Sequence, residues 1–72
     1  MTASNRIIAQ RIEGTTNRAN VLKVGEELLL RNVVKVGDKI VFNNSTYGIH
    51  SNTIDGEEVL SMGESAILAI LD

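Results

Sequence analysis

Few residues of this chain carry useful chemistry. His50 is the single histidine and there is no cysteine, so a thiol nucleophile and a zinc–thiolate centre are both excluded. A Ser-His-Asp assembly would have to recruit Ser45 or Ser51, and neither serine lies in a G-x-S-x-G turn. We therefore predict that His50 is a surface residue on a strand or hairpin, with no catalytic role.

Three carboxylates, Asp55, Glu57 and Glu58, are the remaining candidates for a metal site or an acid–base pair. However, Asp55-Gly56 is a strong signal for a tight hairpin turn, and acidic residues beside such a turn usually face solvent. The segment Val36–Lys39 lacks the second glycine and the G-K-S/T ending of a phosphate-binding loop. We expect no enzyme, no bound metal and no cofactor.

Composition narrows the class of protein further. The chain has 72 residues, a net charge of −2, no proline and no tryptophan, and we interpret residues 1–72 as a single domain. The negative net charge and the presence of only two aromatic residues argue against binding nucleic acid, because such binding requires a basic groove and aromatic side chains on which bases stack. The N-terminus lacks a signal-peptide pattern, and no window approaches the ~20 apolar residues of a membrane span. We expect a cytoplasmic protein that binds no membrane.

The elements that must position these residues are predicted to be strands. Six glycines divide the chain at the spacing typical of a sandwich or barrel, with β-branched runs between them. These runs predict an all-β barrel of about seven short strands, over Arg6–Ile12, Asn20–Val24, Leu28–Val36, Lys39–Phe42, Tyr47–Ser51, Glu57–Met62 and Ala66–Leu71.

Two segments also offer a helix. Ser61 and Glu64 have the spacing of a capping box, but the apolar block Ala66–Leu71 favours a strand by its length and β-branching. The segment Glu26–Arg31 has high helix propensity, but it is too short to propagate by itself. We predict strands in both places.

Several segments, taken in order, resemble the GroES-type co-chaperonin family. That family has a D-R-V-V/I-V-K-R opening strand, an E-V-L/V-A-V-G strand, a V-K-V-G-D-x-V-x-F strand, a Y-G tip, an I-D-x-E-E-Y/V hairpin and an S-E-x-D-I-L-A-I/V ending. The corresponding segments here are Asn5–Arg11, Asn20–Gly25, Val34–Asn43, Tyr47–Ile49, Ile54–Met62 and Glu64–Ile70. Together they cover most of the chain.

The chain also departs from the family in two places. Co-chaperonins carry a long flexible loop after the first strand, whose hydrophobic tripeptide docks on the chaperonin, whereas Ile12–Ala19 is short and polar. The family's roof hairpin is longer than the corresponding segment Glu26–Val33. The resemblance therefore implies the family's barrel in a shortened form without the docking loop.

The resemblance implies a homo-oligomeric ring, a heptamer, in which the first strand of one subunit pairs with the last strand of its neighbour. Terminal strands rich in β-branched residues also predict open edges that a second copy can cover. The predicted subunit interface consists of Arg6, Ile7, Ile8, Ala66, Ile67, Leu68 and Ile70.

Two further surfaces are predicted. Leu28, Leu29 and Leu30 form the apolar triplet available for partner contact, with a covering role on the barrel or ring as the alternative. By resemblance, Tyr47 faces the enclosed cavity, and covering a barrel end is the alternative.

The expected function is that of a co-chaperonin-like ring which caps or contacts a chaperonin and assists folding, without enzymatic activity or a cofactor of its own. The alternative is a ring-forming structural or assembly module that no longer binds a chaperonin. So small a chain also suits a compact genome such as that of a bacteriophage.

Overall fold

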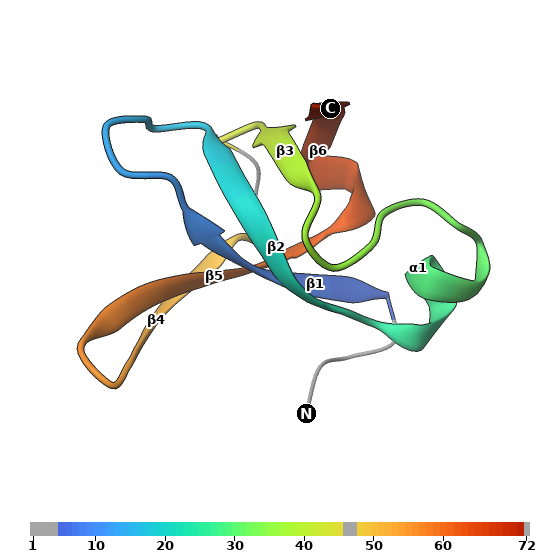
Figure 1. Cartoon of the computed structure of the whole chain (residues 1–72), viewed down its shortest axis with the longest axis horizontal. Helices are drawn as coiled ribbons and strands as arrows, with labels where there is room; N and C mark the ends of the chain where they lie inside the picture. The colour runs from blue at the N-terminus through green and yellow to red at the C-terminus, as the bar shows by residue number, and fades with distance from the viewer. Residues whose placement is uncertain (1–4, 46–47, 72) are drawn as a thin grey trace.

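The computed structural model describes residues 5–45 and 48–71. It forms six strands, one short helix and one 3-10 turn, in the order β1 Arg6–Arg11, β2 Arg18–Val24, α1 Glu26–Leu30, β3 Lys39–Phe42, β4 His50–Ile54, β5 Glu57–Gly63, η1 Glu64–Ala66 and β6 Ile67–Leu71 (Figure 1). The predicted all-β class is confirmed.

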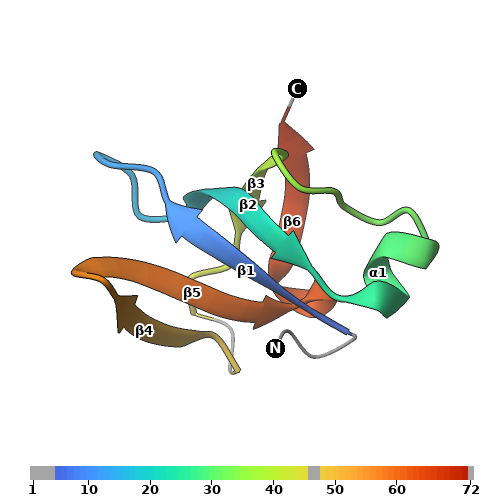
Figure 2. The same cartoon turned by 60° about the horizontal axis from the view of Figure 1, so that its bottom comes forward.

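All six strands belong to one antiparallel sheet with the order β4-β5-β1-β2-β3-β6. Register shifts at Ile8/Ala9 and at Val41/Phe42 are bulges, which bend a strand and increase its twist. The sheet therefore curls, as Figures 1 and 2 show. Within the described residues the curl does not close: β4 and β6 remain the two edges, and the expected barrel is a strongly curved open sheet.

One face of the curled sheet buries an aliphatic core. Alternate residues on the inner strands point inward, as the two-residue period of a strand requires. Phe42 is the largest of the fully buried side chains. The main core positions are Ile7, Ala9, Ala19, Val21, Ile40, Phe42, Leu60 and Met62, and Leu28, Val34 and Ala66 pack against them from outside the strands.

The predicted strand over Leu28–Val36 is wrong. The chain forms the five-residue helix α1 and then turns through Asn32, whose φ is +59°. A single helical turn is unstable alone, but Leu28 is 1% exposed within the core and anchors this one. Three consecutive leucines have no strand alternation, so the helical propensity of Glu26–Leu30 prevails. The loss of this strand explains why the described residues form six strands and not about seven.

Two other local predictions are confirmed. Asp55 and Gly56 have φ values of +51° and +81° and form the tight turn between β4 and β5, where positive φ at both central positions is the type I′ requirement. The end of the chain is strand β6, as predicted. The capping-box interpretation fails because Ser61 lies within β5, where its Oγ accepts a hydrogen bond of 3.0 Å from Arg6 Nε.

Candidate functional site

The polar residues considered for catalysis do not lie together in one site. His50 is exposed on β4, and the two glutamates of β5 are bound separately by polar neighbours. Gln10 Nε2 donates to Glu57 at 3.1 Å, and Ser51 Oγ donates to Glu58 at 2.6 Å. Among the described residues, no group of three or more His, Asp and Glu side chains is arranged to hold a metal. The polar candidates considered from the sequence therefore do not form one site in the described part of the chain.

On the first strand, the structure separates the three predicted interface residues. Ile7 is fully buried in the core, whereas Ile8 lies on the opposite face of the sheet. The expected open edge is wrong for this part of β1, because residues Arg6–Ala9 pair with β5 and Ile7–Arg11 pair with β2. The side chain of Ile8, not the main chain here, is what β1 offers to a neighbour.

The Arg6 side chain is directed within its own subunit. Its Nε and Nη2 donate to the Ser61 Oγ and carbonyl at 3.0 and 2.8 Å, and Nη2 also donates to the Gly48 carbonyl. Arg6 therefore ties the start of β1 to β5 and to the segment that leads into β4.

On the last strand, β6 has one edge without a partner. The strand pairs with β3 alone among the described elements. Ile70 lies opposite the buried Ile40, so it shares the core-facing side of the sheet, yet it is 42% exposed because nothing covers it at the edge. Leu68, beside the bulge, is 63% exposed, whereas Ala66 is buried. The edge of β6 thus combines free backbone groups with uncovered aliphatic side chains.

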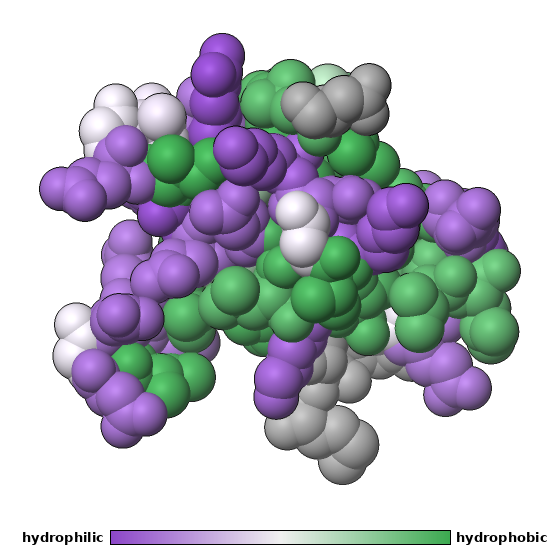
Figure 3. Space-filling view, in the orientation of Figure 1, coloured by the Kyte–Doolittle hydropathy of each residue, from purple (hydrophilic) through white to green (hydrophobic). Residues whose placement is uncertain are grey.

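The leucine triplet divides between the core and solvent. Leu28 points into the core, while Leu29 and Leu30 on α1 are 53% and 77% exposed. Figure 3 shows this apolar surface over α1, at the right of the molecule. The described triplet therefore offers two apolar side chains to a partner, and not three.

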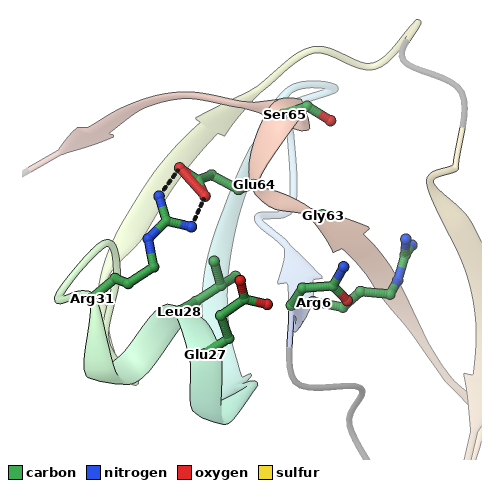
Figure 4. Close-up of a pocket in the computed structure, with 8 residues that line it drawn as sticks. Arg6, Glu27, Leu28, Arg31, Gly63, Glu64 and Ser65 are labelled. Carbon is green, nitrogen blue, oxygen red and sulfur yellow. Dashed lines mark hydrogen bonds and ion pairs between the residues drawn. The ribbon is translucent and has the colours of Figure 1, made fainter.

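The helix α1 is held against η1 by a bidentate ion pair. Arg31 Nη1 and Nη2 donate to the Glu64 carboxylate at 3.0 and 3.3 Å. Beneath this pair lies a polar hollow of about 560 Å³. Figure 4 shows Leu28 and Glu27 on the α1 side of this hollow and Gly63 and Ser65 on the other.

The connection between β1 and β2 is compact. Ile12 donates its N–H to the Arg18 carbonyl at 2.9 Å, and Thr15 donates its N–H and its hydroxyl to the Ile12 carbonyl at 3.1 and 2.7 Å. Gly14, with a φ of +84°, allows the turn. Figures 1 and 2 place this connection and α1 at opposite ends of the molecule.

One surface was not predicted from the sequence. The outer face of β1, β2, β4 and β5 is hollowed into a groove of about 650 Å³. We call this the outer groove and define it by four aliphatic residues that line it: Ile8, Leu22, Ile54 and Val59. A strand pattern would not find Leu22, because it is the extra residue at the β1–β2 bulge, between the partners of Ile8 and Ala9.

Tyr47 lies outside the described residues, so its predicted place on a cavity side remains a prediction. In the part of the chain that the structure covers, no helix has the length and apolar character needed to cross a membrane.

The described residues form a small antiparallel sheet that is curled around an apolar core and has exposed aliphatic side chains on its edge strand β6. The family described as "Chaperonin 10 Kd subunit" matches residues 1–71, and the chain belongs to this family. Two curated relatives, each named Co-chaperonin GroES, come from Haemophilus influenzae strains Rd and PittEE. Each is 48% identical over 62 residues, covering 79% of this chain and 65% of the relative. The chain thus spans less than two thirds of the length of these relatives.

Proposed function

We propose that this protein is a co-chaperonin: a non-enzymatic, homo-oligomeric ring that contacts a chaperonin and assists protein folding in the cytoplasm. The family match over residues 1–71 is the observation that carries this proposal. The 48% identity to the two GroES co-chaperonins supports it.

The ring is proposed to form at the edge of β6. An unpaired strand edge is a template for a strand of another chain, and a neighbour there would also cover Leu68 and Ile70. The proposed contact comprises Ile67, Leu68 and Ile70 of one subunit and the Ile8 side chain of the next, because the main chain of β1 around Ile8 is already paired on both sides. Arg6, Ile7 and Ala66 lie behind this contact. A head-to-tail contact of this kind closes into a ring when its rotation divides a full turn. We take the heptamer from the family resemblance.

The chaperonin contact is proposed to use Leu29 and Leu30. Each buried leucine contributes about 1.5–3 kcal/mol, and these two are adjacent and exposed. The connection between β1 and β2 offers no comparable anchor, because its residues 13–17 are polar or glycine. A contact through α1 would engage the end of the molecule opposite that connection.

The alternative is a ring-forming assembly module that does not bind a chaperonin. The compact, self-bonded β1–β2 connection favours it, since a closed polar turn presents little apolar area to a partner.

Native mass spectrometry and chaperonin capture together distinguish the two functions. We expect a ring at low micromolar concentration, and its retention by an immobilised bacterial chaperonin with nucleotide. If the protein forms a ring that the chaperonin does not retain, with or without nucleotide, the co-chaperonin function is excluded and the assembly module is supported. A stable monomer would contradict both functions.

The proposed contact is tested separately with the double variant Leu29→Ser/Leu30→Ser. We expect chaperonin retention to be lost while the ring remains, because neither leucine belongs to the proposed ring contact and both are exposed in the folded subunit. The matched control is Val36→Ser, which also removes an exposed aliphatic side chain but lies outside α1. Equal retention of all three proteins would exclude α1 as the contact.

A further inference from the structure

We propose that the open edge of β4 binds an extended segment of an unfolded polypeptide, which adds to the sheet as a further antiparallel strand. The segment that fits has aliphatic side chains at alternate positions and a lysine or arginine near its N-terminal end. This inference goes beyond the proposed function, because strand addition to β4 requires neither the ring nor the chaperonin.

The position of β4 in the sheet leaves one of its sides open. Among the described elements β4 pairs with β5 alone, and it ends the sheet in the order β4-β5-β1-β2-β3-β6. Figure 2 shows β4 on the outer side of the hairpin that it forms with β5. An unpaired strand edge is a template for a strand of another chain.

The backbone groups that β4 offers follow from its register. Ile54 and Glu57 flank the two-residue turn, and the first and last residues of such a turn share a hydrogen bond. Because hydrogen-bonded and non-hydrogen-bonded pairs alternate along an antiparallel ladder, Ser51 and Thr53 direct their N–H and C=O groups away from β5. The complementary partner is an extended main chain whose own groups are unpaired, as in an unfolded polypeptide.

The edge of β4 carries none of the usual protections against such pairing. Exposed edges are commonly protected by proline, by lysine or by a bulge, whereas β4 has the sequence HSNTI and pairs with β5 without a register shift. All five of its residues are exposed. The proposed ring contact uses β6 and Ile8 on β1, and β5 separates β1 from β4. The edge of β4 therefore stays open in the proposed ring.

The side chains beside this edge select an aliphatic segment. Asn52 and Ile54 line the outer groove, and Val59 lies next to Asn52 on β5. A strand added beside β4 places every second side chain on this face of the sheet. Ile54 is 57% exposed, so an aliphatic side chain at one of these positions covers it. The groove thus favours a segment with alternate aliphatic residues.

The charge at the turn sets the direction of the segment. Asp55, Glu57 and Glu58 lie at the turn end of the hairpin, and the two glutamates accept hydrogen bonds from neutral side chains only. In the part of the chain that the structure describes, the sole ion pair joins α1 to η1, so these three carboxyl groups have no cationic partner. β4 runs toward the turn, and an antiparallel segment therefore begins beside it. A lysine or arginine near the N-terminal end of the segment meets this acidic end.

Amide hydrogen exchange of the full chain, followed by NMR, tests the contact. The probe is the peptide Lys-Val-Thr-Val-Thr-Val with both ends blocked. We expect the peptide to slow exchange at the amides of Ser51 and Thr53 and to leave the amides of β6 unchanged. The matched peptide with glutamate in place of lysine should bind several-fold more weakly at low salt, and the difference should diminish at high salt because the charges are exposed.

A variant at the edge provides the second test. Thr53→Pro removes the outward N–H of β4 and leaves the pairing with β5 in place, since proline is tolerated on the open side of an edge strand. It should weaken peptide binding by about tenfold or more, because a hydrogen bond is lost and the proline ring obstructs the approach. The control Thr53→Val retains the N–H and should bind the peptide like the natural protein. Circular dichroism verifies that each variant is folded.

The outcomes distinguish this contact from others. Absence of peptide binding, protection confined to β6, or equal binding by natural protein and Thr53→Pro would each overturn the inference. A doubled assembly mass in native mass spectrometry without peptide, abolished by Thr53→Pro, would also overturn it, because the occupant would then be a second copy. If Thr53→Pro does not fold, protection of Ser51 and Thr53 alone decides. The proposed ring and chaperonin contact stand or fall by their own experiments.

Discussion

Arg31 and Glu64 join the helix α1 to the turn before the last strand, across 33 residues of sequence. The pair is bidentate, and its side chains are 54% and 42% exposed. It therefore orients α1 while remaining accessible to water and salt.

We expect this ion pair to contribute little to stability. Exposed pairs are worth about 0–1 kcal/mol because the solvent screens both charges. A double-mutant cycle with Arg31→Met and Glu64→Gln, followed by urea unfolding at one subunit concentration, should give a coupling below about 1 kcal/mol that diminishes at high salt. A coupling of several kcal/mol that salt does not alter would contradict the exposed geometry.

Leu28 should contribute far more than its neighbours on the same helix. Leu28→Ala removes a buried side chain and should cost about 2–5 kcal/mol, which is comparable with the total stability of so small a domain. Leu30→Ala is the matched control and should change the free energy of unfolding by less than about 0.5 kcal/mol. Similar losses in the free energy of unfolding for both variants would mean that α1 does not pack on the core through Leu28.

The turn between β4 and β5 should require glycine at position 56. Gly56 has a φ of +81° with open space around it, so Gly56→Ala is limited by backbone strain of about 1–2 kcal/mol and not by a clash. Gly63→Ala is the control, because Gly63 has a φ of −91° and an added Cβ would lie 3.9 Å from its nearest neighbours. The thermal unfolding midpoint of Gly56→Ala should be well below that of Gly63→Ala. The reverse order would contradict the turn geometry.

Arg6 should stabilise the subunit itself, whatever its role between subunits. Its guanidinium donates to Ser61 and to the Gly48 carbonyl, and hydrogen bonds from charged groups contribute about 1.5–3 kcal/mol. Arg6→Met should therefore lower the free energy of unfolding by that amount, while Arg18→Met, at an exposed arginine of β2, should change it little. If Arg6→Met weakens assembly without affecting subunit unfolding, the side chain acts mainly between copies.

Much of the fold follows from local patterns in the sequence. β3 has the predicted bounds Lys39–Phe42, because a glycine turn precedes it and its alternate residues Ile40 and Phe42 are both core positions. The Asp55-Gly56 turn was equally predictable, since few residue pairs tolerate two successive positive φ values.

The errors arise where local patterns are ambiguous. Leu28, Leu29 and Leu30 are identical apolar residues, so the sequence does not show which of them faces the core. In the structure only Leu28 is buried, and the segment forms a helix instead of a strand. Ile7 and Ile8 are similarly indistinguishable in the sequence, yet one is core and the other lies in the outer groove. The order in which strands pair is set by the packing of the whole sheet, so the doubly paired β1 and the outer groove could not be predicted.

Among the described residues, one edge of β6 has no partner strand, and this exposes a newly made subunit to aggregation. A short uncharged aliphatic strand without proline is the kind of segment that nucleates cross-β aggregates when it stays exposed. Any neighbour that covers it thereby removes an aggregation hazard. In the proposed ring, a subunit would therefore depend on prompt assembly for its solubility, so many copies would have to be made close together in time and space.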